Sequence, residues 1–209
     1  MVDKNYTSNV FINCPFDGEF IELRDAILFA IFDCGFIPRC ALEENNGNDV
    51  RFDKIKRLIF ESKFGIHDIS RTDLDKENQL PRFNMPLELG VFIGAAKYGD
   101  KQQKGKSMLI FDKEQYRYQK FISDIAGQDI RSHGNNPEKA ISHVRDWLSS
   151  ESRRTSIPGG KDILKRFKEF KKDLPAICVN ARLEQEEVKY NELCNFISEW
   201  LAQNIRTSN

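Results

Sequence analysis

Two acidic residues, Asp68 and Glu88, stand on either side of a long polar connection within "IHDISRTDLDKENQLPRFNMPLELGVFIGAAK", residues 66–97. Asp68 follows a short apolar run that is typical of a buried strand, and Glu88 lies near the start of an apolar helical pattern. Two carboxylates at one crevice can cleave a glycosidic bond, because one attacks the anomeric carbon and the other protonates the leaving group. The pair therefore raises the hypothesis of glycosidic bond cleavage.

The two carboxylates are expected to differ in pKa. Pro86 stands in the opening turn of the predicted helix, and Glu88 follows within that first turn. The helix dipole favours a charged carboxylate there, so we expect a lowered pKa for Glu88, which suits a nucleophile. Asp68 ends a buried strand, where loss of water raises the pKa of a carboxyl group, so we expect Asp68 to be the acid.

Both residues also have ordinary structural explanations. Acidic residues are common in the first turn of a helix because the dipole stabilises them, which would account for Glu88 without any catalysis. Asp68 stands two residues before Ser70 and could form a turn or a cap. Cys14 has no base near it in the sequence, so we do not expect it to be a nucleophile.

Further candidate contacts follow the ends of the predicted strands, since ligands of doubly wound sheets bind outside the carboxyl ends of the strands. Residues after the first strand are expected to line the sugar and the base, and residues before Glu88 to orient sugar hydroxyls or a phosphate. Asn13 could instead satisfy backbone groups, and Arg82 could pair with Glu88 or simply solvate the connection. The predicted substrate-binding residues are Asn13, Phe16, Asp17, Ser70, Arg82, Asn84 and Met85.

Strand-like and helix-like segments alternate about five times along the first 152 residues. This alternation predicts a parallel sheet with helices on both faces, and crossover handedness limits it to a doubly wound, flavodoxin-like α/β fold. Asn136 followed by Pro137 predicts the start of the last of these helices. The predicted strands are 9–14, 36–42, 63–70, 106–112 and 128–133, and the predicted helices are 18–35, 51–62, 84–99, 115–127 and 136–152.

The composition changes after residue 152. Residues 152–162 read as a linker because they are rich in Arg, Ser, Pro and Gly, and two helical segments follow at about 161–173 and 184–204. We therefore divide the chain into an α/β domain, 1–152, and a helical C-terminal extension, 153–209. The apolar stripe of the extension cannot form a core alone, so we expect it to pack on the α/β domain or to form a homo-oligomer with a second chain.

The bulk composition argues against several other functions. The 32 basic and 32 acidic residues leave a formal net charge of +0, which gives no support for nucleic-acid binding. The five cysteines and three histidines lack the spacings of disulfide frameworks and zinc sites, and there is no P-loop or GxGxxG, so we expect neither metal nor cofactor. With no signal-peptide pattern and no bilayer-spanning apolar run, we expect a cytoplasmic protein without membrane contact.

The segments "FGIHDIS", "NMPLELGVFIGAAKYGDK" and "SMLIFD" resemble the nucleoside 2-deoxyribosyltransferase-like superfamily, which includes deoxynucleoside-5′-monophosphate N-glycosidases. The hallmark of that family is an Asp after the third strand and a Glu in an "ELG.A" motif that opens the next helix. Asp68, Glu88, Leu89, Gly90 and Ala95 occupy these positions. The resemblance, which spans about residues 8–150, implies that Glu88 takes the sugar and Asp68 handles the base.

The first strand, in "FINCP", is also similar to that of Toll/interleukin-1 receptor (TIR) domains, whose bacterial members cleave NAD⁺ with one Glu or act as scaffolds. Both resemblances imply an N-glycosidase or deoxyribosyltransferase-type enzyme acting on a nucleotide, a nucleoside or an NAD-like substrate. By analogy, such an enzyme would serve in bacterial stress or antiviral defence. The alternative is a TIR-like NAD-cleaving enzyme, or a non-catalytic module that senses a nucleotide or contacts other proteins.

Overall fold

The computed structural model describes residues 4–44, 46–74 and 79–206 of the 209-residue chain, so part of the predicted 71–83 connection, residues 75–78, lies outside the description. Its centre is a five-stranded, all-parallel sheet with the strand order β2-β1-β3-β4-β5. This is the flavodoxin-like order, and the predicted fold class is confirmed. The strands are β1 (Asn9–Asn13), β2 (Ile37–Arg39), β3 (Phe64–Asp68), β4 (Ser107–Asp112) and β5 (Ile130–Ser132).

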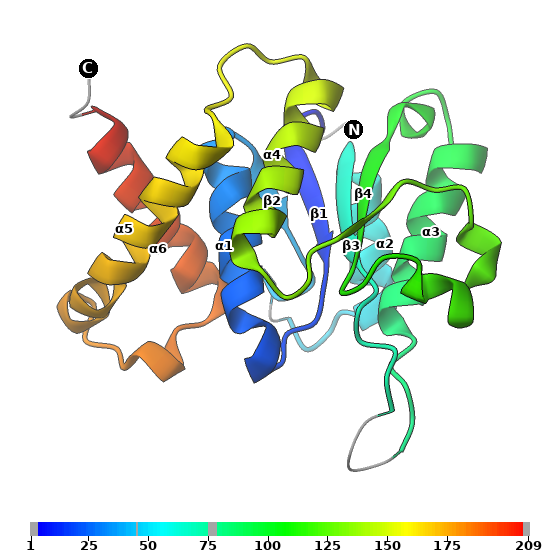
Figure 1. The fold of residues 1–209 in the computed structure, drawn as a ribbon, viewed down its shortest axis with the longest axis horizontal. Helices are drawn as coiled ribbons and strands as arrows, with labels where there is room; N and C mark the ends of the chain where they lie inside the picture. The colour runs from blue at the N-terminus through cyan, green and yellow to red at the C-terminus, as the bar shows by residue number, and fades with distance from the viewer. Residues whose placement is uncertain (1–3, 45, 75–78, 207–209) are drawn as a thin grey trace.

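Helices cover both faces of the sheet (Figure 1). Asn136 caps the fourth helix, because its side chain accepts hydrogen bonds from the backbone N–H groups of Glu138 and Lys139. The predicted helix 115–127 is instead two short 3₁₀ turns, since Phe121 and Ile122, with φ of −136° and −148°, leave the helical region between them. The α-helices are α1 (Ile21–Asp33), α2 (Arg51–Phe60), α3 (Asn84–Tyr98), α4 (Pro137–Ser152), α5 (Gly160–Asn180) and α6 (Tyr190–Arg206).

Successive side chains along each strand point to opposite faces of the sheet, so the hydrophobic core is divided between the two faces. In β1, Val10 and Ile12 join the larger hydrophobic cluster together with α1 and α4, whereas Phe11 joins Leu58 of α2 and Phe92 of α3 on the other face. The same period of two holds in the other buried strands. The face toward which each polar strand-end residue points is therefore set by its position in the strand.

The C-terminal helices pack on α1 of the same chain. The Phe29 ring lies 5.6 Å from Phe167, 5.5 Å from Phe170 and 6.0 Å from Trp200, measured between ring centroids. α5 runs past its predicted end and contains Pro175. The apolar stripe of the extension is thus covered within the chain, where it shares one hydrophobic cluster with the α/β domain.

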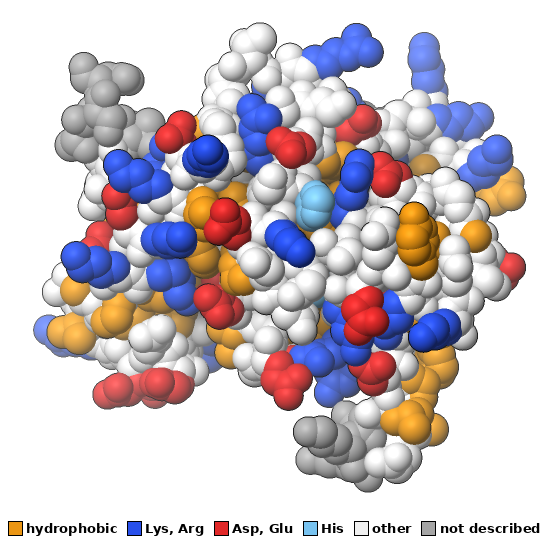
Figure 2. Space-filling view, viewed as in Figure 1, with side chains coloured by type: hydrophobic (Ala, Val, Ile, Leu, Met, Phe, Trp, Pro, Cys, Tyr) orange, Lys and Arg blue, Asp and Glu red, His pale blue; other side chains and the backbone are white. Residues whose placement is uncertain are grey.

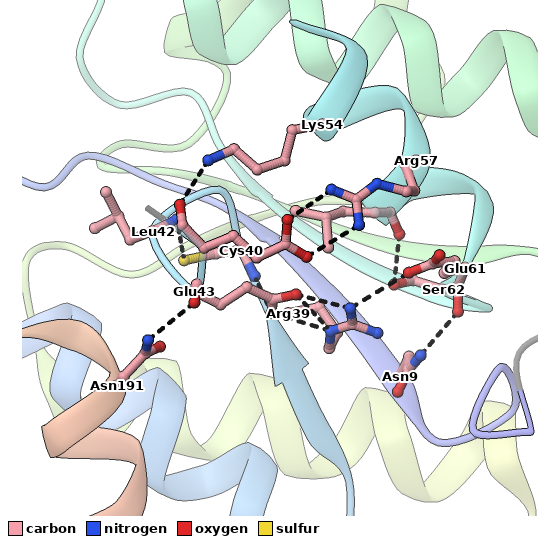
Figure 3. Close-up of polar contacts among 12 residues, drawn as sticks. Asn9, Arg39, Cys40, Leu42, Glu43, Lys54, Arg57, Glu61, Ser62 and Asn191 are labelled. Carbon is pink, nitrogen blue, oxygen red and sulfur yellow. Dashed lines mark hydrogen bonds and ion pairs between the residues drawn. The ribbon is translucent and has the colours of Figure 1, made fainter. Parts of the chain in front are cut away.

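Edge strand β2 is fastened by a network of polar contacts in the loop after it (Figure 3). The Arg39 guanidinium donates to the Glu43 carboxylate at 2.7–3.0 Å and to Glu61 at 3.3 Å. The Glu43 carbonyl accepts from the Asn191 side chain at 2.9 Å, which links this loop to α6. The edge position and the three-residue length of β2 also explain why Pro38 is tolerated in it.

Charged side chains of both signs are interspersed on the face shown in Figure 2, in keeping with the balanced composition. None of the helices in the described ranges is long and apolar enough to cross a membrane.

Candidate functional site

The start of α3 is held against the carboxyl end of β1 by Asn13. Its side-chain amide donates to the Met85 carbonyl at 2.8 Å and lies 3.1 Å from Nδ1 of His67. Asn13 and Met85, both predicted to bind substrate, are therefore buried against each other. The geometry matches the alternative explanation for Asn13, in which its side chain satisfies a backbone group near the strand end.

His67 is a neutral buried imidazole beside Asn13. Burial lowers its pKa to about 3, with a smaller contribution from the charge of Lys106. Since Nδ1 accepts from the Asn13 amide, the ring proton lies on Nε2, which makes no hydrogen bond with the described residues. His67 thus supports Asn13 rather than carrying charge at the site.

Glu88 is the fifth residue of α3, because the helix begins at Asn84, so its predicted place in the first turn was wrong. Its side chain is buried, with 9% of the residue exposed, and no hydrogen bond or ion pair joins it to the described part of the chain. Burial raises its pKa to about 7, with Arg51 opposing the shift. The predicted lowering was also wrong, because the dipole effect fades beyond the first turn and desolvation outweighs it.

Asp68 is fully enclosed at the end of β3. One oxygen, Oδ1, accepts the Ser70 backbone N–H at 2.9 Å, and the other, Oδ2, lies 3.0 Å from Nε2 of His133. Neither Asp68 nor His133 exposes any surface. Asp68 is therefore enclosed by protein groups, with one oxygen hydrogen-bonded and the other in contact with the His133 ring.

His133, which directly follows β5, was not among the residues that the sequence predicted for the site. Its Nδ1 accepts the Asn135 backbone N–H at 2.9 Å, so a neutral ring carries its proton on Nε2, toward Asp68. The Nε2–Oδ2 contact is close but is not aligned as a hydrogen bond. The rings of Phe20 and Phe111 stand edge-on to His133, at centroid distances of 6.2 and 5.8 Å, and hold it in place. No spacing in the sequence indicated this pairing.

Cys14 lies near both predicted catalytic carboxylates. Its thiol pKa is raised well above the usual value, chiefly by burial and further by the nearby charges of Asp68 and Glu88. Asp68 shares its side of the sheet with Phe64 and Ile66, toward α1 and α4, whereas Glu88 comes from α3 on the opposite side. The structure therefore brings both carboxylates to the same sheet edge, but from opposite faces.

Arg117 is a second functional candidate that the sequence did not reveal. Its guanidinium donates to Asp112 Oδ1 at 2.6 and 2.9 Å, and to the carbonyls of Ile69 and Ser70 at 3.1 and 2.9 Å. Burial raises the pKa of Asp112, although Arg117 opposes that rise. Arg117 thus clamps the exit of β3 to the exit of β4. The only signal in the sequence was Asp112 at the end of a predicted strand.

The other predicted contacts are distributed around this edge. Asp17 forms a two-point ion pair with Arg71, at 2.7 and 3.0 Å, which ties the loop after β1 to the segment after β3. Phe16 is half-buried on the core, and Ser70 is buried beside Asp68. Arg82 and Asn84 are the exposed polar side chains at the start of α3.

A hollow of about 530 Å³ lies elsewhere, between α4 and the β4–β5 edge, and its walls include Trp147, His143 and Arg131. It reaches Ser107, the first residue of β4, and so approaches the amino end of the sheet. Across the described ranges, no three His, Cys, Asp or Glu side chains are grouped to hold a metal ion.

The fold and the site together define a doubly wound α/β protein in which a buried carboxyl group, that of Glu88, lies near the carboxyl ends of β1 and β3 and has no partner in the described ranges. Comparison of the chain with protein families, with curated proteins and with solved structures gave no match.

Proposed function

We propose that this protein is an N-glycosidase or deoxyribosyltransferase-type enzyme that breaks the base–sugar bond of a nucleotide, nucleoside or NAD-like substrate. The observation that carries the proposal is Glu88, a buried carboxyl group without a partner among the described residues and with a pKa near 7. Burying such a group is costly for a fold, and strongly shifted carboxyl groups concentrate at catalytic sites. The resemblance of the Asp68 and Glu88 motifs to the deoxyribosyltransferase-like superfamily supports the same reading.

Glu88 would act as the nucleophile in two steps. A carboxylate oxygen forms a bond to C1′ of the sugar while the C1′–N bond breaks. The electron pair of the broken C1′–N bond leaves with the base. Water, or a second base, then attacks C1′ and displaces the carboxylate. When water attacks, its hydroxyl group stays on C1′ of the sugar, and its remaining proton neutralises the charge of the released base.

The other residues would position this reaction. Asp68, held by Ser70 and His133, keeps the exit of β3 in one conformation and would influence departure of the base through the local charge. Asn13 fixes the turn of α3 that precedes Glu88. Arg82 and Asn84, exposed at the start of α3, would contact sugar hydroxyls or a phosphate.

The test is base release from NAD⁺, deoxynucleoside monophosphates and nucleosides, measured by chromatography with the purified chain. Wild type should release base from at least one class, and Glu88→Gln should lower the rate about 100-fold or more. Glu169→Gln, on the exposed side of α5, is the matched control and should keep full activity. Wild type that releases nothing, or Glu88→Gln that stays active, contradicts the proposal.

The enclosure of Asp68 favours a second candidate, a non-catalytic module that binds a nucleotide. Because Asp68 is fully enclosed, with Oδ1 hydrogen-bonded and Oδ2 against His133, the site would offer a substrate one carboxyl group instead of the two that glycosidases use. This candidate predicts that nucleotides raise the melting temperature of the chain without base release. Turnover that depends on Glu88 excludes it.

A further inference from the structure

α3 has an apolar face that the described residues leave exposed. Only two of its 15 residues are charged, Glu88 and Lys97, and a helix that is apolar all round is normally buried on every side. Met85, Leu89 and Phe92 are buried against the sheet. On the outer side, Leu87 is 55% exposed and Tyr98 is 85% exposed. Phe83, at the N-cap position just before the helix, is 66% exposed.

Two glycines lie along this outer face, in the stripe that runs from Phe83 through Leu87 to Tyr98. A Cβ atom at Gly90 or at Gly94 would meet no heavy atom within 4 Å, so packing inside the chain does not require a glycine at either position. Each glycine costs a helix interior roughly 1 kcal/mol relative to alanine. A close approach by another backbone would account for both of them.

We propose that this face, formed by Phe83, Leu87, Gly90, Gly94 and Tyr98, is the docking surface for a second copy of this chain, with the two α3 helices antiparallel about a two-fold axis. The half-buried Val91, which packs partly against the cluster of β1 and α2, lies at the margin of the face. Reflection of the sequence about the midpoint between Gly90 and Val91 exchanges Leu87 with Gly94 and Val91 with Gly90, so a large residue is matched with a glycine in both pairs. The antiparallel arrangement therefore places Leu87 opposite Gly94 of the second copy. It also places Val91 opposite Gly90, and Phe83 opposite Tyr98.

This self-complementarity favours a second copy over other occupants. A two-fold interface requires one patch to fit itself, which the pairing of Leu87 with Gly94 achieves as a side chain entering a gap. The stripe has no charged residue that would select a charged partner. A helix that lies on a membrane surface is usually rich in Lys and Arg, whereas α3 contains only Lys97.

The exposed area also suits a dimer. Aromatic side chains can bury roughly 150–250 Å² each, so the exposed parts of Phe83, Tyr98 and Leu87 offer on the order of 400 Å² of apolar surface per copy. A standard interface buries roughly 800 Å² per partner, of which about 60% is apolar. The face of α3 can therefore supply most of the apolar part of such an interface.

This location differs from the homo-oligomer expected through the C-terminal helices, whose apolar residues are covered by α1. α5 and α6 lie at one end of the molecule and α3 at the other (Figure 1). Because Leu87 directly precedes Glu88, a dimer through α3 would also hold the helical turn that carries the candidate nucleophile. The dimer does not depend on the proposed enzymatic activity.

The test is the mass of the full chain in solution, measured by light scattering and sedimentation over a dilution series. Wild type should form a dimer that dissociates on dilution. Gly94→Leu should raise the dissociation constant at least tenfold, because it fills the gap for Leu87, and a Cβ atom at this position meets no heavy atom within 4 Å in the isolated fold. Leu87→Gln should have a similar effect, and Val179→Gln, at a 73% exposed position on α5, should have none.

A size swap tests the pairing itself. The double variant Leu87→Ala/Gly94→Leu exchanges the positions of the large and the small residue. It should therefore dimerise more tightly than Gly94→Leu alone. Circular dichroism should show native helix content in both variants. The proposal is overturned if wild type is a monomer at every concentration. It is equally overturned if the dimer persists unchanged in Gly94→Leu and Leu87→Gln.

Discussion

Asp68 and His133 form a fully buried pair that joins the end of β3 to the segment after β5, with Oδ2 and Nε2 3.0 Å apart. The pair crosses β4, which lies between these strands in the sheet. It fixes the exits of three strands together, because the His133 backbone N–H also donates to the Asp112 carbonyl at 3.1 Å. The candidate site is therefore built on a rigid edge of the sheet rather than on its loops alone.

A double-mutant cycle should reveal the coupling between Asp68 and His133. His133→Gln removes the ring that contacts Oδ2 of the buried Asp68, so it should lower the free energy of unfolding by about 1–3 kcal/mol. Asp68→Asn combined with His133→Gln should cost less than the sum of the two single changes, since neither partner is then left alone. Urea denaturation at neutral pH measures all four proteins. Strictly additive losses would contradict a direct interaction.

Glu88→Gln should stabilise the fold at alkaline pH. The pKa of Glu88 is about 7 in the folded chain and 4.5 ordinarily, so the folded state binds more protons than the unfolded state between these values. Wild-type stability therefore falls as pH rises from about 4.5 to about 7 and stays low above that range. At pH 8 the variant should gain up to about 3 kcal/mol, with little gain at pH 4. Urea denaturation at both pH values measures the difference, and Glu169→Gln should show none.

Base release should increase as pH rises through about 7. A nucleophilic carboxylate must be ionised, and Glu88 is protonated below its raised pKa. In kcat/KM this appears as a roughly tenfold gain per pH unit on the acid side, followed by a plateau. A rate that is flat between pH 5 and pH 8, or that falls over this range, would assign another role to Glu88.

Arg117→Lys should weaken the contacts that connect the end of β4 to the segment after β3. The guanidinium contacts Asp112, Thr72 and two carbonyls at once, and an ammonium group cannot reproduce this fork. Arg117→Ala should lower the free energy of unfolding by about 3–5 kcal/mol, because it removes the guanidinium that pairs with the buried Asp112 carboxylate. Arg117→Lys should lower it by less. Hydrogen exchange should show faster opening after β3 in both variants. Arg131→Lys, at an exposed position, serves as the control.

Local patterns determined much of the architecture. The alternation of short apolar runs with amphipathic segments was enough to predict the doubly wound sheet, because each pattern buries one kind of surface and crossover handedness leaves few topologies. The cap at Asn136 was predictable for the same reason, since its contacts lie within three residues. Placement of Asp68 at the carboxyl edge of the sheet also followed from the sequence.

The chemistry of the site was decided by tertiary contacts. Burial, which depends on what packs over α3, turned the expected lowering of the Glu88 pKa into a rise. The position of Asp68 within β3 turned its side chain toward His133, a residue far along the chain, and away from the face that carries α3. Local sequence encodes helix and strand preferences because these arise between near neighbours. Desolvation and the pairing of charges arise between distant segments, so only the assembled fold determines them.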